Sequence, residues 1–390
     1  MTKLAIVGGK LQGMEVAYLA RKASIETVVI DRDPMAPALS LADEAIILDT
    51  VEEPRVAANI FKDCDAVLPA NEDLSTLKGL TEMLTQMDIP FIFDLNAYEV
   101  SSSKIKSNDF MKSLDIPMPK PWPECGFPVV VKPSGESGSM GVSRAKNALE
   151  LVKAKEKVLA IAGEPVIQEF VEGPSISVEV IANGTDAVSL VTTQIFLDDE
   201  YDCKMVGSPW KNLDPRVEGV IDEASIRIAK ELHLRGIMDV EAIVCRGSPK
   251  VLEIDARMPS QTPSAVLHSH GINMVSMLTD MVVFDKLDRP NMTTTRAAYY
   301  EHVAVDNGVM RSCGEGVFSE VNDPKVITGL FGSDEMITDY EPGKRSWRAA
   351  IVSSGSTVRS ASLKRKHVLN SIMETENIVS YIDPKPEVYS

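Results

Sequence analysis

The first 95 residues alternate short apolar runs with amphipathic stretches, and this alternation restricts the folds open to the chain. Apolar runs at residues 4–7 and 27–31 flank a helical pattern that ends near residue 23, and Gly8 and Gly9 follow the first run. A strand, a glycine turn, a helix and a second strand predict a parallel sheet. The pattern continues with strands expected at residues 45–49 and 65–69 and helices expected at 53–62 and 74–87. We therefore predict a small doubly wound α/β domain.

A parallel sheet that opens with glycines suggests a dinucleotide site, but the glycine fingerprint is incomplete. The pattern G-x-G-x-x-G requires a glycine where Lys10 stands between Gly8 and Gly13. That glycine lets a pyrophosphate approach the backbone. We expect the loop to line another pocket. An NAD-dependent oxidoreductase stays an alternative, because Asp31 ends the second strand where a ribose contact would lie.

Composition and charge exclude several classes of protein. The 390 residues carry a net charge of −17, and the five cysteines form no C-x-x-C pair. Nucleic acids and anionic membranes are bound by Lys and Arg patches, so we expect neither as a partner. We also expect neither a zinc site nor a disulfide framework. No apolar run reaches the roughly 18 residues of a membrane span, and we expect a cytoplasmic protein.

The middle of the chain has the pattern of an α+β domain. A polar, capped helix is expected at residues 101–114, followed by a proline-rich connector at 116–123. Beyond it we expect strands at residues 128–132, from 141 onward, at 166–173 and at 176–181, with a helix at 148–162.

A glycine-rich loop lies between two of these strands, in the stretch VVVKPSGESGSMGVSRA at residues 129–145. A Walker A loop needs a lysine after its last glycine, whereas Val142 follows Gly141 here. A protein kinase needs H-R-D and D-F-G elements, which the sequence lacks. Lys132 could still reach nucleotide phosphates while loop hydroxyls cap them, with Ser134, Ser137 and Ser139 as candidates. A mobile surface hairpin is the alternative.

Acidic side chains gather on two predicted strands, residues 236–244 and 251–259, joined by a turn at 246–249. Strand side chains alternate between faces, so charged residues two apart share a face. The residues concerned are Asp239, Glu241, Glu253, Asp255 and Arg257. Carboxylate oxygens suit Mg²⁺ that also holds substrate phosphates, which predicts a metal site. A solvated charged hairpin is the alternative.

Together these motifs resemble those of the ATP-grasp ligases over residues 1–290. The resemblance implies an α/β and α+β protein of ATP-grasp architecture. Its parts would be a Rossmann-like (pre-ATP-grasp) domain at residues 1–95, a central ATP-grasp domain at 96–290 with a lid at about 115–185, and a small β-rich cap at 291–390. It also implies ATP and two Mg²⁺ ions. Such ligases form an acyl phosphate that an amine then attacks.

The resemblance also assigns roles to single residues. Those implied for ATP are Lys104, Lys132, Ser134, Ser139, Gln168, Glu169, Phe170, Val171, Glu172, Leu11 and Gln12. Those implied for Mg²⁺ are Glu241, Glu253 and Asp255, although the last position is usually Asn. Arg257 would steady the acyl phosphate and, with Lys132, act in catalysis.

The substrates are indicated by two further stretches. The first domain resembles carboxyaminoimidazole ribonucleotide synthases, and the turn RMPSQTP at residues 257–263 is nearer to D-alanine ligases. Both stay alternatives. The combination is most similar to the ligases of pyrrolysine biosynthesis, which join the carboxylate of 3-methyl-D-ornithine to the ε-amine of L-lysine. Two cationic substrates need carboxylates around their amines. The residues implied are Lys10, Leu11, Gln12 and Glu72 for lysine, and Ser177, Glu179, Ser260, Gln261 and Thr262 for ornithine. Arg257 is also implied in substrate binding.

The remaining features carry less information. Strand-like runs at residues 297–305 and 346–355 and a helical pattern at 360–376 predict a cap that serves packing or a homodimer contact. His268 and His270 lack a third metal ligand, and we expect no role for them. A non-catalytic nucleotide sensor is a last alternative, since it would keep Lys132 but could dispense with Glu241 and Glu253.

Overall fold

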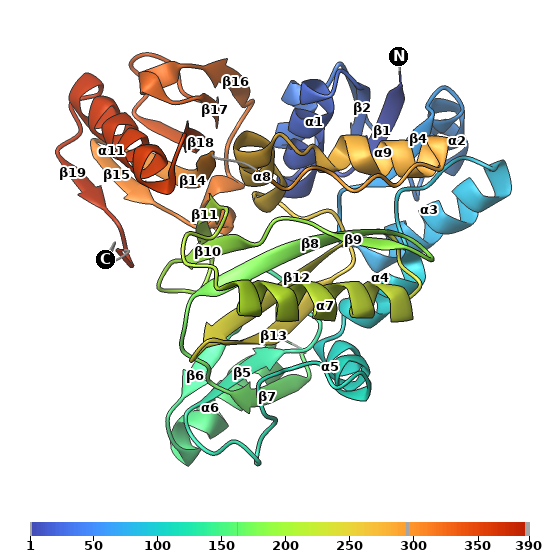
Figure 1. Ribbon diagram of the computed structural model, residues 1–390. Helices are drawn as coiled ribbons and strands as arrows, with labels where there is room; N and C mark the ends of the chain where they lie inside the picture. Colours follow the sequence, from blue (N-terminus) through green and yellow to red (C-terminus); the bar gives the residue numbers. More distant parts are fainter. Residues whose placement is uncertain (1, 162, 294–295, 387–390) are drawn as a thin grey trace.

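The amino-terminal region forms a four-stranded parallel sheet between helices, as the alternation predicts (Figure 1). The strands are β1 (Lys3–Val7), β2 (Glu26–Asp31), β3 (Glu44–Ile47) and β4 (Ala66–Pro69), in the order β3-β2-β1-β4. Its helices are α1 (Leu11–Lys22), α2 (Pro54–Phe61) and α3 (Leu74–Met87), with a 3-10 turn η1 (Pro37–Leu41). One apolar cluster packs α1 on the sheet, and a second packs α2 and α3 on the other face. This computed structural model describes residues 2–161, 163–293 and 296–386.

Two short helices follow where one was expected at residues 101–114. They are α4 (Leu95–Ser101) and α5 (Lys104–Ser113). The helical conformation is interrupted between them because Ser103 caps α5. The Ser103 hydroxyl accepts a hydrogen bond from the backbone N–H of Lys106. Lys104 therefore begins a helix rather than lying inside one.

A three-stranded antiparallel sheet lies within the region predicted to form a lid, and we call this sheet the lid. It consists of β5 (Val129–Pro133), β6 (Ser143–Ala145) and β7 (Pro165–Glu169), in the order β6-β5-β7, with α6 (Ala148–Ala160) packed on it. Residue 162, the end of the predicted helix, lies outside the described residues. The strand expected from residue 141 begins at Ser143, because Gly141 has φ +76° and cannot continue a strand. The strand expected to reach residue 173 ends at Glu169.

A twelve-stranded sheet runs through the central and carboxyl-terminal regions. Its main path is β13-β12-β8-β10-β11-β14-β18-β17-β16. The bounds are β8 (Ser175–Asn183), β9 (Ala187–Ser189), β10 (Thr193–Leu197), β11 (Cys203–Ser208), β12 (Arg235–Cys245), β13 (Ser248–Asp255), β14 (Ala297–Asp306), β15 (Val309–Ser312), β16 (Lys325–Thr328), β17 (Glu335–Thr338), β18 (Ser346–Gly355) and β19 (Ser380–Ile382). The pairing of β11 with β14 makes the predicted cap a continuation of the central sheet. The predicted domain limits stay predictions.

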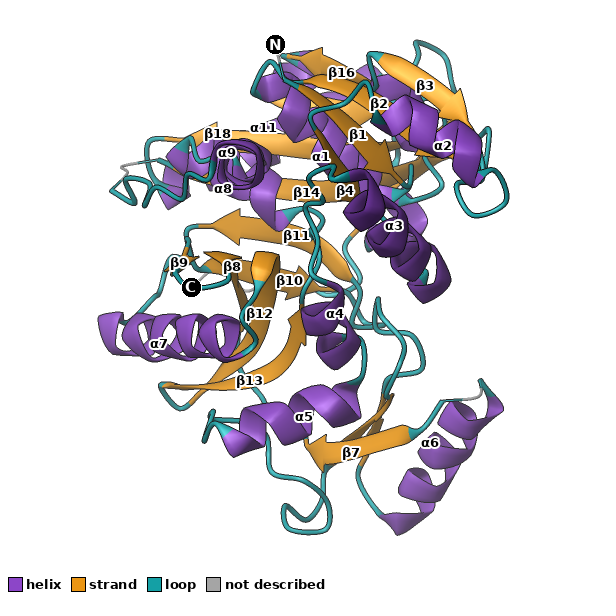
Figure 2. Ribbon diagram, turned by 90° about the vertical axis from the view of Figure 1, so that its right-hand side faces the viewer, coloured by secondary structure: helices purple, strands orange, loops and turns teal. Residues whose placement is uncertain are grey.

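Helices cover this sheet and join it to the amino-terminal region (Figure 2). They are α7 (Pro215–Glu231), α8 (Thr262–His270), α9 (Met274–Phe284), α10 (Glu315–Phe318) and α11 (Val358–Thr375), with a 3-10 turn η2 (Leu330–Gly332). The helix α7 packs on β8 and β12. The helices α8 and α9 lie against α1, so one apolar core includes Leu19, Val275 and Tyr300 from three separate parts of the chain. Among the described residues no helix is long and apolar enough to cross a membrane.

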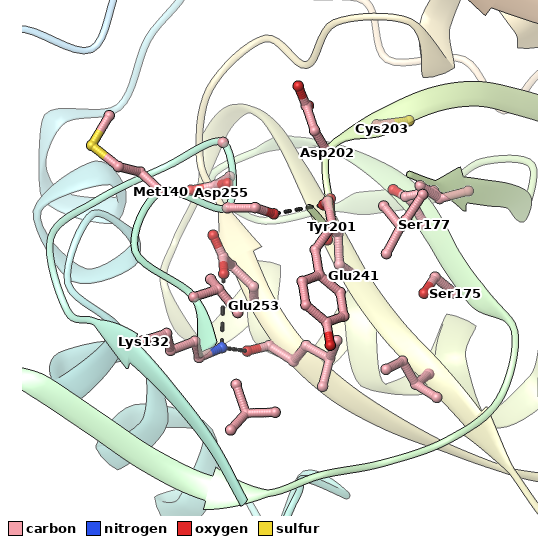
Figure 3. A pocket seen from close by; sticks show the side chains of 18 of the residues that line it. Lys132, Met140, Ser175, Ser177, Tyr201, Asp202, Cys203, Glu241, Glu253 and Asp255 are labelled. Carbon is pink, nitrogen blue, oxygen red and sulfur yellow. Dashed lines mark hydrogen bonds and ion pairs between the residues drawn. The ribbon is translucent and has the colours of Figure 1, made fainter. Parts of the chain in front are cut away.

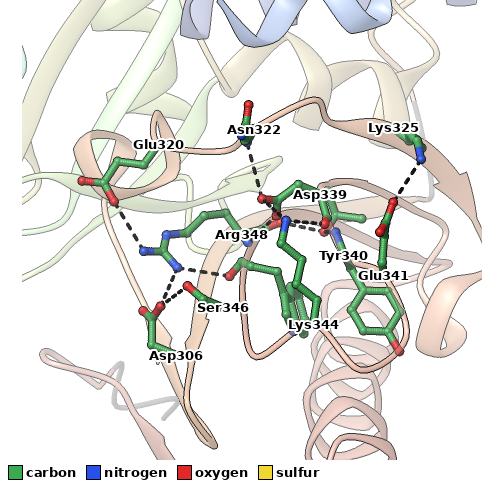
Figure 4. A network of polar contacts seen from close by, with 12 residues as sticks. Asp306, Glu320, Asn322, Lys325, Asp339, Tyr340, Glu341, Lys344, Ser346 and Arg348 are labelled. Carbon is green, nitrogen blue, oxygen red and sulfur yellow. Dashed lines mark hydrogen bonds and ion pairs between the residues drawn. The ribbon is translucent and has the colours of Figure 1, made fainter. Parts of the chain in front are cut away.

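The connection between β17 and β18 is fixed by a polar network around Asp339 (Figure 4). The Asp339 carboxylate accepts hydrogen bonds from the backbone N–H of Arg348 at 2.7 Å and from Lys344 Nζ at 2.8 Å. The Arg348 guanidinium in turn donates to Asp306 at 3.1 Å. These contacts help to hold β14 and β18, the two long strands of the carboxyl-terminal region, in register.

Candidate active site

Two rows of polar side chains cross three neighbouring strands of the large sheet. In the first row Glu179 of β8, Asp239 of β12 and Asp255 of β13 stand in register. In the second row Ser177, Glu241 and Glu253 do the same. Residues two apart on a strand share a face. Five carboxylates therefore lie on one face of the sheet.

The predicted hairpin forms with two differences in detail. The turn is Arg246–Gly247, where both residues have positive φ, rather than four residues long. The strand β13 ends at Asp255, so Arg257 follows the strand instead of lying on it. Its guanidinium still contacts Asp255, with Nη2 to Oδ2 at 3.4 Å.

Burial makes the ionised form of these carboxylates unfavourable and so raises their pKa values. Burial, with the nearby charges of Glu253 and Asp255, raises the pKa of Glu241 to about 8. Burial raises the pKa of Asp255 to about 7 despite the Arg257 guanidinium, and the pKa of Glu179 to about 7. The pKa of Asp239 is also raised, by burial and by Asp255, and its Oδ1 has no hydrogen-bond partner. Buried carboxylates of this kind are stabilised in the ionised form by a cation.

The donor set fits Mg²⁺, which binds through one or two carboxylates together with substrate phosphates. Within the described part of the chain, no group of three or more His, Cys, Asp or Glu residues is arranged to hold a metal by itself. Glu241 and Glu253 are direct cross-strand partners whose side chains face one cavity. A metal ion in that cavity would need ligands from the substrate as well.

The two predicted phosphate lysines share one counter-ion. Lys104 Nζ lies 3.1 Å from Glu253 Oε1. Figure 3 shows Lys132 beside the same carboxylate, with Lys132 Nζ 3.9 Å from Glu253 Oε2. Lys132 Nζ also donates to the carbonyl of Leu252 at 3.1 Å, and burial lowers its pKa. Two ammonium groups from α5 and β5 thus meet the acidic face of the sheet.

The glycine loop folds down over this meeting point. Ser137 Oγ donates to Glu72 Oε2 at 2.7 Å, and Ser139 Oγ donates to the carbonyl of Tyr201 at 2.7 Å. Lys104 Nζ donates to the carbonyl of Glu136 at 2.6 Å. The loop therefore contacts the amino-terminal region, the central sheet and α5 at once.

A cavity of about 340 Å³ lies between the lid and the sheet. Of the residues implied for ATP, those lining it are Lys104, Lys132, Ser139, Gln168, Glu169, Phe170, Val171 and Glu172. Ser134 does not line it, because its hydroxyl is turned toward α5, 3.2 Å from Ser103 Oγ and 3.2 Å from the backbone N–H of Ile105. The structure brings Lys132 of the lid beside Glu241 and Glu253 of the large sheet, which are more than 100 positions away in the sequence.

Residues 168–172, which the family resemblance implies to be a hinge and which we call the hinge, contact basic residues that sequence reasoning missed. Lys250 Nζ lies 2.6 Å from Glu169 Oε2. The Arg144 guanidinium lies over the Phe170 ring, 3.8 Å from its centroid, and 3.6 Å from Glu172. A planar ring at this edge of the cavity is suited to stacking on another aromatic group.

A second cavity, of about 650 Å³, opens at the carboxyl ends of the parallel strands. Lys10, Leu11, Gln12 and Glu72 line it, so Leu11 and Gln12 lie with the residues implied for lysine rather than in the cavity by the lid. Gly8 permits the close approach of β1 and β4, since a Cβ there would lie 2.3 Å from the carbonyl oxygen of Ala70. Arg257, Ser260 and Glu315 line both cavities.

Glu315 is a site residue that the sequence did not indicate. It begins α10 in the carboxyl-terminal region, for which only packing or dimer contact is predicted. Its Oε1 accepts hydrogen bonds from Ser260 Oγ at 2.7 Å and Gln261 Nε2 at 2.5 Å, and burial raises its pKa. No local motif could have identified it, because its role depends on the pairing of β11 with β14.

The other substrate predictions divide into two groups. Ser177, Arg257, Ser260 and Thr262 line the cavity by the lid. Glu179 and Gln261 are buried behind that surface and line neither cavity. His268, for which no role is expected, is hydrogen-bonded to Tyr18 Oη at 2.6 Å in the interface between α8 and α1.

Comparison with known proteins agrees with this geometry. Residues 101–261 match the model of the ATP-grasp domain, and residues 4–92 match the model of the PylC-like amino-terminal domain. The 3-methyl-D-ornithine–L-lysine ligase of Methanosarcina acetivorans is 38% identical over 83% of this chain and 85% of its own length. The same ligase of Methanosarcina mazei is 39% identical over 82% and 83%.

Solved structures support the fold alone. The biotin carboxylase of Campylobacter jejuni superposes with a TM-score of 0.74 at 16% identity, covering 95% of this chain and 91% of its own. The N5-carboxyaminoimidazole ribonucleotide synthetase of Thermotoga maritima gives 0.64 at 20% identity, covering 97% and 98%. The resemblance inferred from the motifs is thereby confirmed, and the chain belongs to the family of 3-methyl-D-ornithine–L-lysine ligases, with an ATP-grasp domain at its centre.

Proposed function

We propose that the protein is an ATP-dependent carbon–nitrogen ligase of pyrrolysine biosynthesis. It joins the carboxylate of 3-methyl-D-ornithine to the ε-amine of L-lysine and releases ADP and phosphate. One observation carries the proposal: Arg257 lines both cavities and pairs with Asp255 of the sheet and with Glu72 of the amino-terminal region. A guanidinium in this position can bind an acyl phosphate that forms in the cavity by the lid and then reacts with an amine bound in the larger cavity.

ATP occupies the cavity by the lid in this proposal. Its adenine stacks at the hinge beside Phe170, and Lys104 and Lys132 exchange their contact with Glu253 for the phosphates. Glu241, Glu253 and Asp255 would hold Mg²⁺, which supplies positive charge beside the transferring phosphoryl group. The number of ions, two in our expectation, follows from the family resemblance.

The reaction has two steps. A carboxylate oxygen of the ornithine-type substrate attacks the γ-phosphorus of ATP in line, the bond to the β–γ bridging oxygen breaks, and ADP leaves. The neutral ε-amine of lysine then attacks the acyl carbon, and phosphate leaves as the amide forms. Arg257 offsets the negative charge on the acyl phosphate in both steps.

The cationic ends of the substrates would be met by acidic residues around the junction of the cavities. Glu315 and Asp202 line both cavities, and Glu72 lines the larger one. A carboxylate that is buried and has a raised pKa gains most from an ammonium partner. The larger cavity at the parallel strands is assigned to lysine, and the surface near Ser177, Ser260 and Thr262 to the ornithine-type acid.

The test is phosphate release from ATP with 3-methyl-D-ornithine or D-ornithine as the acid and L-lysine as the amine, followed by mass spectrometry of the product. We expect phosphate release that requires both amino acids and a product with the mass of the amide. Turnover with aminoimidazole ribonucleotide and bicarbonate, or with D-alanine alone, would favour one of the alternatives instead. ATP binding without phosphate release from any acid would indicate a nucleotide sensor.

Two expectations from the sequence complete the proposal. We propose that the protein is a homodimer that acts on small amino acids. The test of the oligomeric state is the molar mass from light scattering during size-exclusion chromatography. We propose a cytoplasmic location, tested by fractionation of the source cells.

A further inference from the structure

The end of the chain is tied to the central sheet by a buried lysine. Lys204 on β11 is 1% exposed. Its Nζ lies 2.5 Å from Asp383 Oδ1 and 2.5 Å from the carbonyl oxygen of Lys385. A buried ammonium without such partners is strongly unfavourable. Residues 383–386, which we call the strap, follow β19 (Figure 1) and are therefore held against β11 by this lysine.

This anchoring places the next side chain at the cavity by the lid. Lys385 is one of the residues that line that cavity. Its Nζ lies 5.9 Å from the centroid of the Tyr201 ring. Tyr201 also lines the cavity (Figure 3), and its carbonyl accepts the hydrogen bond from Ser139 of the glycine loop. The strap and the lid thus both contact Tyr201, in the connection between β10 and β11 of the central sheet.

Lys385 differs from the other basic residues of the cavity in its partners. Lys104 and Lys132 pair with Glu253, Arg144 pairs with Glu172, and Arg257 pairs with Glu72 and Asp255. Within the described ranges, no ion pair joins Lys385 to a carboxylate, and Asp383 of the strap pairs with Lys204 instead. Lys385 is exposed, and the cavity that it lines is also lined by acidic side chains of the sheet, among them Glu241, Glu253 and Asp255. An anionic ligand is the partner that this arrangement lacks.

We propose that the strap is part of the nucleotide site and that Lys385 binds the phosphates of the nucleotide. This inference rests on the proposed function, because it assumes that ATP occupies the cavity by the lid. Asp383 and Lys204 act as positioning residues: they fix the strap, and the Tyr201 ring orients the Lys385 stem. The carboxyl-terminal region then supplies a cation to the phosphates, as it supplies Glu315 to the substrates.

The test compares point variants of the full chain by calorimetric titration with ATP, ADP and adenosine. We expect Lys385→Ala to weaken ATP and ADP binding by about tenfold, as for the loss of one charged hydrogen bond, and to leave adenosine binding unchanged. Lys385→Arg should restore most of the affinity, and Lys385→Glu should weaken it further. The matched control is Lys325→Ala, since Lys325 is an exposed lysine of the same region whose ion-pair partner among the described residues is exposed Glu341.

Each contrary outcome identifies a different failure. ATP affinity of Lys385→Ala within twofold of the unmodified protein would overturn the inference and leave the proposed function standing. An equal loss for ATP and adenosine would also overturn it, because the strap would then shape the cavity without contacting phosphate. Absence of ATP binding by the unmodified protein would overturn the proposed function itself.

Discussion

Glu72 and Arg257 form an ion pair, with Nε to Oε1 at 2.8 Å, that joins the end of the parallel sheet to the end of β13. The same carboxylate accepts hydrogen bonds from Gln12 Nε2 at 2.8 Å and Ser137 Oγ at 2.7 Å. Glu72 is therefore in contact with the amino-terminal region, the lid and the arginine. Its contacts are wider than the predicted contact with a substrate amine, because Glu72 links Arg257 to Ser137 of the lid loop.

Replacing this arginine should affect catalysis more than folding. We expect Arg257→Ala to lower kcat by about 10²–10³, since a charged group aimed at the acyl phosphate is lost. Arg257→Lys should recover little, because a point charge cannot contact Glu72 and Asp255 together. The measurement is phosphate release at saturating ATP and amino acids. An Arg257→Ala enzyme with unchanged kcat would contradict the role, and exposed Arg216→Ala is the control.

The three predicted metal ligands should not be equivalent. We expect Glu241→Gln and Glu253→Gln to abolish turnover, because each removes a charged oxygen ligand from the cavity. Asp255→Asn should keep substantial activity, because Asn is the residue that the family resemblance implies at this position. The readout is phosphate release as a function of Mg²⁺ concentration. Full activity of Glu253→Gln would contradict the metal assignment.

Stability without metal should fall as the pH rises. Because the pKa of Glu241 is raised to about 8, the folded state holds a proton on this group that the unfolded state has already lost above about pH 4.5. The free energy of unfolding therefore decreases as the pH rises from about 4.5 to about 8, because only the unfolded state ionises this group over that range. We expect Glu241→Gln to gain stability relative to the unmodified protein over that range, measured by urea unfolding in EDTA. Added Mg²⁺ should reduce the difference, because the ion binds the ionised carboxylate.

Glu315 should influence substrate affinity without affecting nucleotide affinity. We expect Glu315→Gln to raise the KM of one cationic amino acid by about tenfold, because a charged hydrogen bond becomes a neutral one. The dissociation constant of ATP, measured by titration without amino acids, should stay the same. A parallel change in both constants would indicate that Glu315 only supports the fold.

Replacing Gly8 should destabilise the fold because of its backbone conformation and its close contact with β4. Its φ is +118°, and a Cβ at this position would lie 2.3 Å from the Ala70 carbonyl oxygen, which leaves no room for a side chain. We expect Gly8→Ala to lower the free energy of unfolding by about 2 kcal/mol or more. Gly79→Ala in α3 is the matched control, since a Cβ there would have no atom within 4 Å, and it should stabilise by about 0.5–1 kcal/mol. Equal melting temperatures of the two variants would contradict this explanation.

The sequence by itself determined the local elements and the chemistry that they can carry. The parallel strands, the glycine loop with Lys132, and the pair Glu241 and Glu253 could be predicted, because apolar periodicity, glycine and strand alternation act over short distances. The family resemblance followed from these same residues. Boundaries were wrong where a single backbone angle decided them, as at Gly141 and Arg246.

Only the tertiary structure decided which distant residues share the site. Glu72 meets Arg257, Glu315 meets Ser260, and Lys385 reaches the cavity by the lid through the anchoring of Asp383 on Lys204. None of these pairs is set by local pattern. Each depends on long-range strand pairing and on a core shared by three parts of the chain, and burial then requires that charged groups brought together in this way find partners.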